Sequence, residues 1–223
     1  MDSGLIAIIS LCVFLALWYG GGYLYNRRRG QRLFRWLEAG LDVLGGERAA
    51  GWIGSPAAGA RINVTHADAP FRRLELTLLL ENREIPLLWL WDRLHGKRDW
   101  LIIKGTLRSP RKGEIEVFPA GARLGQDLCG EQKQPWTCQE SLHGLSIAFQ
   151  GLGAQRQVAG LKPWLETWGA QLSRLSWRKQ DPHIQLQMKV TGLLSTSSAR
   201  FLADLQTALE KTMRGKAANV REL

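Results

Sequence analysis

The stretch YLYNRRRGQRLFRW, residues 23–36, divides the chain into an apolar beginning and a basic remainder. Directly before it, the run GLIAIISLCVFLALWYGGGYLY (4–25) holds 22 residues and no charge. At 1.5 Å per residue this run forms a helix about 33 Å long, enough to cross a hydrocarbon core about 30 Å thick. We therefore predict a single transmembrane helix over residues 4–25. Because glycine weakens a helix, Gly20 to Gly22 predict that the regular helix ends near Gly20.

Residues at the end of the apolar run are those expected at a membrane surface, where aromatic rings mark the headgroup level and basic residues mark the cytoplasmic side. A cleavable signal peptide would carry its positive charge before the apolar run, and WYGGGY is a poor cleavage site. We therefore predict an uncleaved, single-pass anchor in the cell membrane, with residues 1–3 outside, the remainder in the cytoplasm, and anionic lipid as a partner. The predicted membrane-interface residues are Trp18, Tyr19, Tyr23, Tyr25, Arg27, Arg28, Arg29, Arg32 and Arg35.

Residues 26–45 have the amphipathic spacing of a basic juxtamembrane helix that ends at Gly45 and Gly46. Two interpretations are open: the helix lies on lipid, or it packs as the first helix of the domain. The acidic residues Glu38 and Asp42 favour packing, because apolar stripes usually face a core. Residues 46–60, rich in glycine and alanine, predict a linker.

Residues 61–214 predict a cytoplasmic α+β domain with a mostly antiparallel sheet and packed helices, followed by a basic flexible tail at 215–223. Pro86 and Pro163 each predict a helix start, because proline fits the first helical position. Two hairpins are predicted, across RSPRKG (108–113) and RKQDP (178–182). Both halves share the order strand, helix, hairpin, which is either a duplicated β-α-β-β unit or a coincidence.

We find no motif for catalysis, cofactor or metal binding, and predict no cofactor and no small-molecule substrate. GSPAAGAR (54–61) lacks the lysine and hydroxyl of a phosphate-binding loop, and GLGAQR (151–156) lacks the third glycine of a dinucleotide fingerprint. The spacing of Cys129, Cys138 and His143 does not fit a structural zinc site. The favoured interpretation of the two cysteines is two unlinked thiols, with a disulfide as the alternative, because the cytoplasm is reducing.

The charge of the chain favours an anionic partner. After residue 25 the chain carries 30 basic and 19 acidic residues, a balance of 30 − 19 = +11. Several basic clusters adjoin tryptophan, a combination that suits RNA or flexible anionic segments. The candidate partner-binding residues lie at and beside the two predicted hairpin turns: Lys104, Arg108, Arg111, Lys112, Arg174, Trp177, Arg178 and Lys179.

Three hypotheses of function follow. The first is a membrane-anchored, non-enzymatic interaction module, an accessory or adaptor subunit of a membrane-associated protein complex. The second is a membrane-tethered factor that binds ribosomes or RNA, for example one that assists membrane protein insertion. The third is a membrane-bound enzyme whose site assembles from residues far apart in sequence; the absence of motifs favours a non-enzyme.

Overall fold

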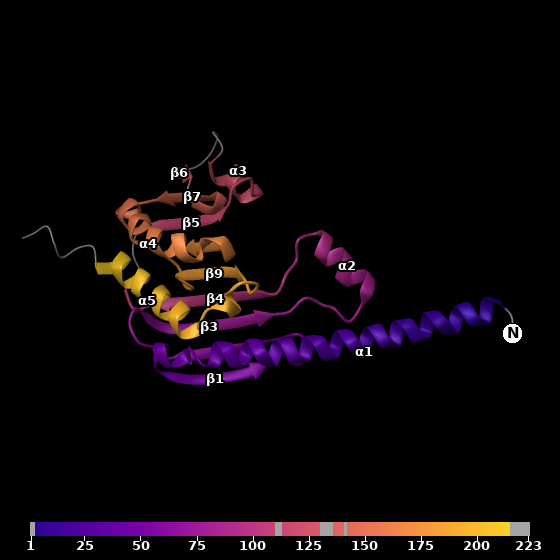
Figure 1. Cartoon of the computed structure of the whole chain (residues 1–223). Coiled ribbons are helices and arrows are strands. Elements are labelled where there is room, and N and C mark those ends of the chain that lie inside the picture. Colours follow the sequence, from indigo (N-terminus) through magenta and orange to yellow (C-terminus); the bar gives the residue numbers. More distant parts are fainter. Residues whose placement is uncertain (1–2, 110–112, 130–135, 141, 215–223) are drawn as a thin grey trace, which may run out of the picture.

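A computed structural model describes residues 3–109, 113–129, 136–140 and 142–214 and confirms the α+β class. A long apolar helix, α1 (Ser3–Glu38), leads into a nine-stranded antiparallel sheet, and its N-terminal part extends well beyond that sheet (Figure 1). The strands are β1 (Glu47–Trp52), β2 (Gly59–Thr65), β3 (Phe71–Leu79), β4 (Trp100–Leu107), β5 (Glu114–Pro119), β6 (Thr137–Glu140), β7 (Leu145–Gln150), β8 (Leu172–Trp177) and β9 (Ile184–Lys189). The other helices are α2 (Pro86–Leu94), α3 (Arg123–Cys129), α4 (Ala154–Trp168) and α5 (Ser198–Arg214), with 3-10 turns η1 (Leu41–Leu44), η2 (Leu142–Gly144), η3 (Gly169–Gln171) and η4 (Leu193–Ser195).

The strands follow the order β1-β2-β3-β4-β9-β8-β5-β7-β6. The connection from β3 to β4 contains α2, which stands beyond the end of the sheet beside α1 (Figure 1). Strand β9 joins the two parts of the sheet by pairing with β4 on one side and β8 on the other. The β8–β9 hairpin predicted across RKQDP is confirmed.

One face of the sheet forms the hydrophobic core. Register places a continuous apolar row across seven strands, because side chains at paired positions point to the same face. All members of this row are fully buried: Ile62, Leu76, Ile103, Leu186, Leu175, Val117 and Ile147. The helices α1, α4 and α5 pack on this face and contribute to the same core cluster.

The opposite face, called the open face below, carries polar side chains between the buried positions. Its neighbouring row reads Asn63, Glu75, Lys104, Gln185, Ser176, Glu116 and Ala148 across the same strands. The clean alternation along β9, where Gln185 and Gln187 are half-buried between buried neighbours, is typical of a sheet with one solvated face.

The predicted helix break at Gly20 is wrong, since α1 runs without interruption from Ser3 to Glu38. Packing of the domain against the second half of α1 stabilises the helix beyond the glycines. Leu33 and Leu37, together with Leu41 and Leu44 of η1, are buried in the core, so this segment packs rather than lying on lipid. Residues 46–60 are not simply a linker, because they contain β1 and the start of β2.

Two further expectations are corrected. Strands β4 and β5 exist, but they do not form a hairpin: β4 pairs with β3 and β9, whereas β5 pairs with β7 and β8. Helix α4 begins at Ala154, so Pro163 lies inside the helix rather than at its start. The proposed duplicated β-α-β-β unit depended on both features, so the structure does not support it.

Candidate functional site

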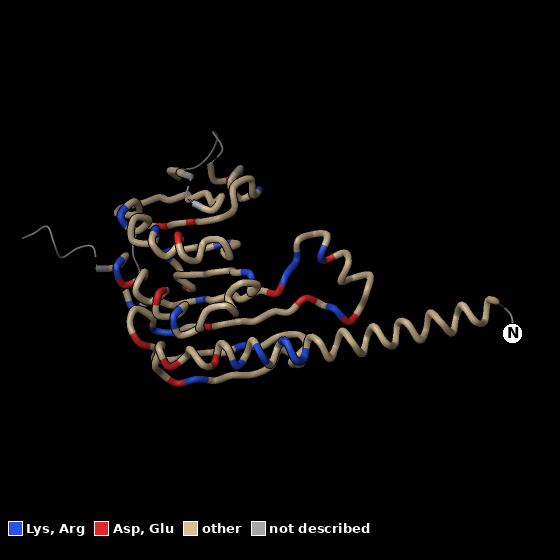
Figure 2. Tube along the Cα trace, viewed as in Figure 1, with Lys and Arg blue, Asp and Glu red and all other residues tan. Residues whose placement is uncertain are grey.

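The first part of α1 is exposed on all sides. An 18-residue window of this helix has a mean hydropathy of 2.1, and no residue in it is buried. Among the described residues, α1 is the one helix long and apolar enough to cross a membrane. Its charged residues begin only where it reaches the domain, as Figure 2 shows. The helix thus divides into an uncovered apolar part and a part packed against the sheet.

A stripe of small and buried residues joins the second part of α1 to the domain. Gly22, Asn26, Gly30, Leu33 and Leu37 follow the spacing of one helix face. The two glycines leave no room for a side chain: an added Cβ would lie 2.3 Å from the Arg83 carbonyl oxygen at Gly22, and 2.0 Å from the Pro56 carbonyl oxygen at Gly30. Loops of the domain therefore approach the helix backbone directly.

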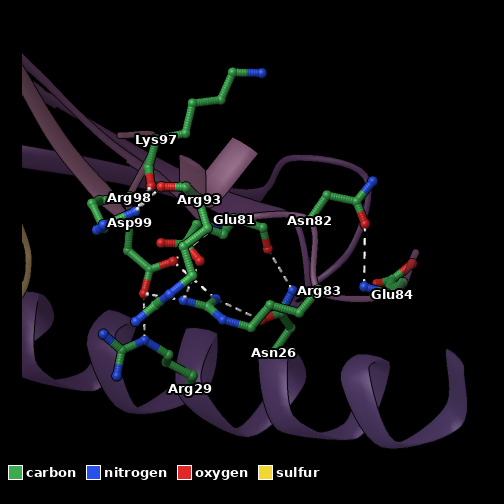
Figure 3. A network of polar contacts seen from close by, with 10 residues as sticks. All are labelled: Asn26, Arg29, Glu81, Asn82, Arg83, Glu84, Arg93, Lys97, Arg98 and Asp99. Atoms are coloured by element: carbon green, nitrogen blue, oxygen red, sulfur yellow. Dashed lines mark hydrogen bonds and ion pairs between the residues drawn. The ribbon is translucent and has the colours of Figure 1, made fainter. Parts of the chain in front are cut away.

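Between these glycines lies the Asp99 cluster, which we define as Asn26, Arg29, Glu81, Arg83 and Asp99 (Figure 3). Arg83 binds both carboxylate oxygens of Asp99, with Nη1 3.0 Å from Oδ1 and Nη2 3.1 Å from Oδ2. Arg29 donates from α1 to Asp99 Oδ2, and the Glu81 backbone N–H donates to Oδ1 at 2.9 Å. The Asp99 side chain is 2 % exposed, so its two cationic partners balance a charge that has little water around it.

Asn26 connects the same cluster to the helix. Its amide Nδ2 donates to the Glu81 carbonyl oxygen at 2.8 Å, and its Oδ1 accepts from Arg83 Nη1 at 2.8 Å. Arg83 Nη2 also lies 3.2 Å from Glu81 Oε2, an ion-pair distance, although that oxygen accepts no well-oriented hydrogen bond among the described residues. Every member of the cluster thus joins α1 to the segments that flank α2.

The electrostatics of the cluster keep its central pair charged. Burial by itself raises the pKa of Asp99, but hydrogen bonds from Arg83, from the Glu81 backbone and from Arg29 more than offset this and lower the pKa below its usual value. Burial lowers the pKa of Arg29, and its hydrogen bond and attraction to Asp99 reverse that effect, so its pKa is raised. Both groups are therefore ionised across the physiological range.

Three of the predicted membrane-interface residues, Trp18, Tyr25 and Arg29, contact or belong to the Asp99 cluster. Trp18 Nε1 donates to the Arg83 carbonyl oxygen at 3.1 Å, and the Tyr25 ring lies 5.4 Å from the Arg83 guanidinium. Tyr19 is exposed, Tyr23 is half-buried, and Arg29 turns into the Asp99 cluster. Within the described part of the chain, the exposed side chains of Arg27, Arg28 and Arg32 form no ion pair, and Arg35 contacts only the Gln31 carbonyl oxygen one turn earlier.

The predicted partner-binding residues do not form one surface. Lys104, Arg174 and Arg178 lie on the open face, and Lys179 is exposed at the β8–β9 turn. Arg108 donates to the backbone oxygens of Phe71 and Ala67 instead. Trp177 is fully buried in the core, which removes its ring from any partner surface. Arg111 and Lys112 lie outside the described residues.

Sequence reasoning missed the carboxylate that organises the open face. Glu116 is completely buried in β5, and its Oε1 accepts from Ser176 Oγ at 2.6 Å and from Arg178 Nη2 at 2.6 Å. Its Oε2 accepts from Arg174 Nε at 3.1 Å. The two arginines thus neutralise a buried charge and stay partly exposed. The alternating pattern EIEVF placed Glu116 opposite the core-facing residues, but its partners come from a strand some 60 positions later in the chain.

The favoured interpretation of the cysteines is wrong, because Cys129 and Cys138 form a disulfide that joins α3 to the edge strand β6. No group of three or more His, Cys, Asp or Glu side chains is placed to hold a metal ion within the described ranges. The chain matches no protein-family model, and no curated protein is significantly similar to it.

Proposed function

We propose that this protein is a single-pass membrane anchor joined rigidly to a non-enzymatic α+β interaction module, an accessory subunit of a membrane-associated complex. The observation that carries the proposal is the continuity of α1, which passes without a break from an uncovered apolar part into the core of the domain. A signal peptide is removed from the mature protein, whereas here Gly22, Asn26 and Gly30, which directly follow the apolar part, are packed against the domain.

The rigid junction supports a role in placing the domain. A helix connected by a flexible linker lets its domain sample many heights and orientations, whereas the Asp99 cluster fixes the domain to one face of α1. Holding a binding surface at constant height and orientation raises its effective concentration for a partner at the same membrane. The open face, with its half-exposed Lys104, Arg174 and Arg178, is the surface that we assign to that partner.

The anchor is tested by intact-mass measurement of the protein from membranes that have been washed at high pH. The proposal predicts that the full chain, including residues 4–25, stays in the membrane pellet. A mature protein that begins after Gly22, or release into the wash, would contradict it.

The interaction module is tested by chemical crosslinking of the full-length protein in native membranes, with and without nuclease. Protein crosslinks that persist after nuclease treatment and are lost in Lys104→Glu, but not in Lys162→Glu on the outer surface of α4, support the open face as the docking surface. Crosslinks lost on nuclease treatment would favour the ribosome- or RNA-binding alternative, for which the basic balance of the domain is the supporting observation.

Two observations disagree on which side of the membrane the domain lies. The arginines that follow the span favour a cytoplasmic domain, whereas the Cys129–Cys138 disulfide favours an oxidising compartment. We propose the cytoplasmic side, because Arg27, Arg28 and Arg32 adjoin the span directly. A membrane-impermeant maleimide applied to intact cells tests this with Leu152→Cys, an exposed position of the domain. No labelling before lysis agrees with the proposal, and labelling of intact cells would reverse it.

A further inference from the structure

Helix α2 presents an apolar face that no described part of the protein covers. No residue of α2 is buried among the described residues, although its sequence PLLWLWDRL is mostly apolar. Leu87 is 80 % exposed, Leu94 is 75 % exposed and Trp91 is 62 % exposed. At 100° per residue these three side chains, with Leu88 and Leu90, fall on one arc of the helix. Such a face in water would be costly, since apolar area contributes stability only when it is buried.

The position of α2 identifies what covers this face. The Trp89 ring contacts the Trp18 ring of α1, with 5.8 Å between centroids, and Gly22 allows the preceding loop to touch the α1 backbone. Trp18 lies within the apolar run, about 10 Å along the helix from its end at Tyr25. In Figure 1, α2 lies crosswise to α1 and level with the apolar part of that helix. A bilayer that surrounds this part of α1 therefore also meets α2.

The polar side of α2 matches the headgroup region. Asp92 pairs with Lys97 Nζ at 2.7 Å, and the Arg93 guanidinium lies 5.7 Å from the centre of the Trp89 ring. Arg98 donates to the backbone oxygens of Arg93 and Lys97 at the end of the helix. At 100° per residue Asp92 and Arg93 fall outside the arc of the exposed leucines, and Lys97 and Arg98 follow the end of the helix. Helices that lie in a membrane surface likewise keep their basic residues off the apolar face, at the phosphate level.

We propose that α2 is a second membrane contact, which inserts its leucine- and tryptophan-rich face into the leaflet that receives the end of the α1 span. The proposal depends on the membrane anchor proposed above, and commits to phospholipid rather than protein as the occupant. Interfacial helices of this kind penetrate about 5–10 Å, which agrees with the depth of Trp18. Two contacts fix the rotation and tilt of the domain, whereas a single helix leaves rotation about its axis free.

Spin labels on the full-length protein in phospholipid nanodiscs test the proposal. Single cysteines at Leu87→Cys and Leu94→Cys are labelled in a Cys12→Ser background, which removes the free thiol of the described residues. Collisions with oxygen, which partitions into lipid, are compared with collisions with a water-soluble nickel chelate. A label at Leu11→Cys, in the proposed span, is the control for lipid. A label at Leu152→Cys is the control for water, because Leu152 is a comparably exposed leucine, 84 % exposed, at the opposite end of the sheet.

We expect the labels at 87 and 94 to resemble the label at 11, with oxygen collisions several-fold more frequent relative to nickel than at 152. Labels at 87 and 94 that resemble 152 while 11 reports lipid would overturn the second contact and leave the anchor intact. A label at 11 that also reports water would overturn the anchor itself. Low collision rates with both reagents at 87 and 94 would place a protein on this face, and would also overturn the proposal.

Discussion

Helices α2 and α4 contain the same kinds of residue but have opposite surroundings. Each combines proline with tryptophans and leucines, and each follows a strand. In α4, Leu161, Trp164, Leu165 and Trp168 are buried against the sheet and α5. In α2 the corresponding apolar residues face outward beside the uncovered part of α1. Composition therefore shows that a helix has an apolar side to bury, but only the fold shows whether another part of the protein buries it.

The largest effect is expected from Asp99→Asn, which removes the charge that attaches the α2 connection to α1. Arg29 would then lose its carboxylate partner in a mostly buried site, and Arg83 would keep only its ion pair with Glu81. Breaking such a buried pair typically costs about 3–5 kcal/mol. Denaturant unfolding of the protein in nanodiscs measures this loss. Asp42→Asn is the control, because it breaks an exposed pair with Arg48 and should cost under about 1 kcal/mol. Equal effects of the two substitutions would contradict the assigned role of the cluster.

A matched pair of leucine truncations compares the two helices directly. Leu161→Ala in α4 creates a cavity in the core and should lower the free energy of unfolding by about 2–5 kcal/mol. Leu87→Ala in α2 opens no cavity in the protein, so in detergent the change should stay within about 0.5 kcal/mol. A large loss from Leu87→Ala under these conditions would show that the protein itself covers this face.

The close approach between α1 and the α2 connection depends on Gly22. In Gly22→Ala the new methyl group would collide with the Arg83 carbonyl oxygen, and overpacking of this kind costs about 1–3 kcal/mol. At Gly21 no described atom lies within 4 Å of an added Cβ, so Gly21→Ala should be neutral or stabilise the helix by up to about 1 kcal/mol. Thermal unfolding of both variants measures the difference. If Gly21→Ala is the more harmful of the two, the helix face has been assigned incorrectly.

The smallest effect is expected from pH. Because the pKa of Asp99 is lower in the folded state, its contribution is fully present above the unfolded pKa of about 3.9 and is lost only as pH falls through the folded value. Stability should therefore show no contribution from Asp99 titration between pH 5 and 8. Below about pH 4 the wild type should lose stability more steeply than Asp99→Asn. A difference between the two slopes at neutral pH would contradict this assignment.

The sequence predicts the features that depend on local patterns. The apolar run, the fold class and the strands with clean alternation, such as β9 with Ile184, Leu186 and Met188, are found in the structure. The pairing of β4 and β5 was wrong, because RSPRKG is an acceptable turn and nothing local shows that β9 pairs with β4 instead. The sequence also predicts a helix start at Pro163, since the local pattern does not reveal that α4 is packed on both sides of this residue.

The candidate site was only half predicted. The rings and arginines at the end of the apolar run are recognisable from their order alone, but Asp99 is one acid among many in a charged segment. Its importance comes from meeting Arg29, which is 70 positions away in the chain, and Arg83. The exposed face of α2 was missed for a similar reason, because PLLWLWDRL has the composition of a core helix. Long-range contacts of this kind leave no mark in a local pattern.

Hydrogen exchange in phospholipid nanodiscs tests most directly whether lipid protects α2 from opening, as packing on the sheet protects α4. A helix shorter than about 12–15 residues is marginal in water, so an uncovered α2 should open often and exchange quickly. We expect the amides of 89–94 to be protected to nearly the same degree as those of α4. Fast exchange at 89–94, alongside strong protection in α4, would show that α2 lies in water and would contradict the proposed lipid contact.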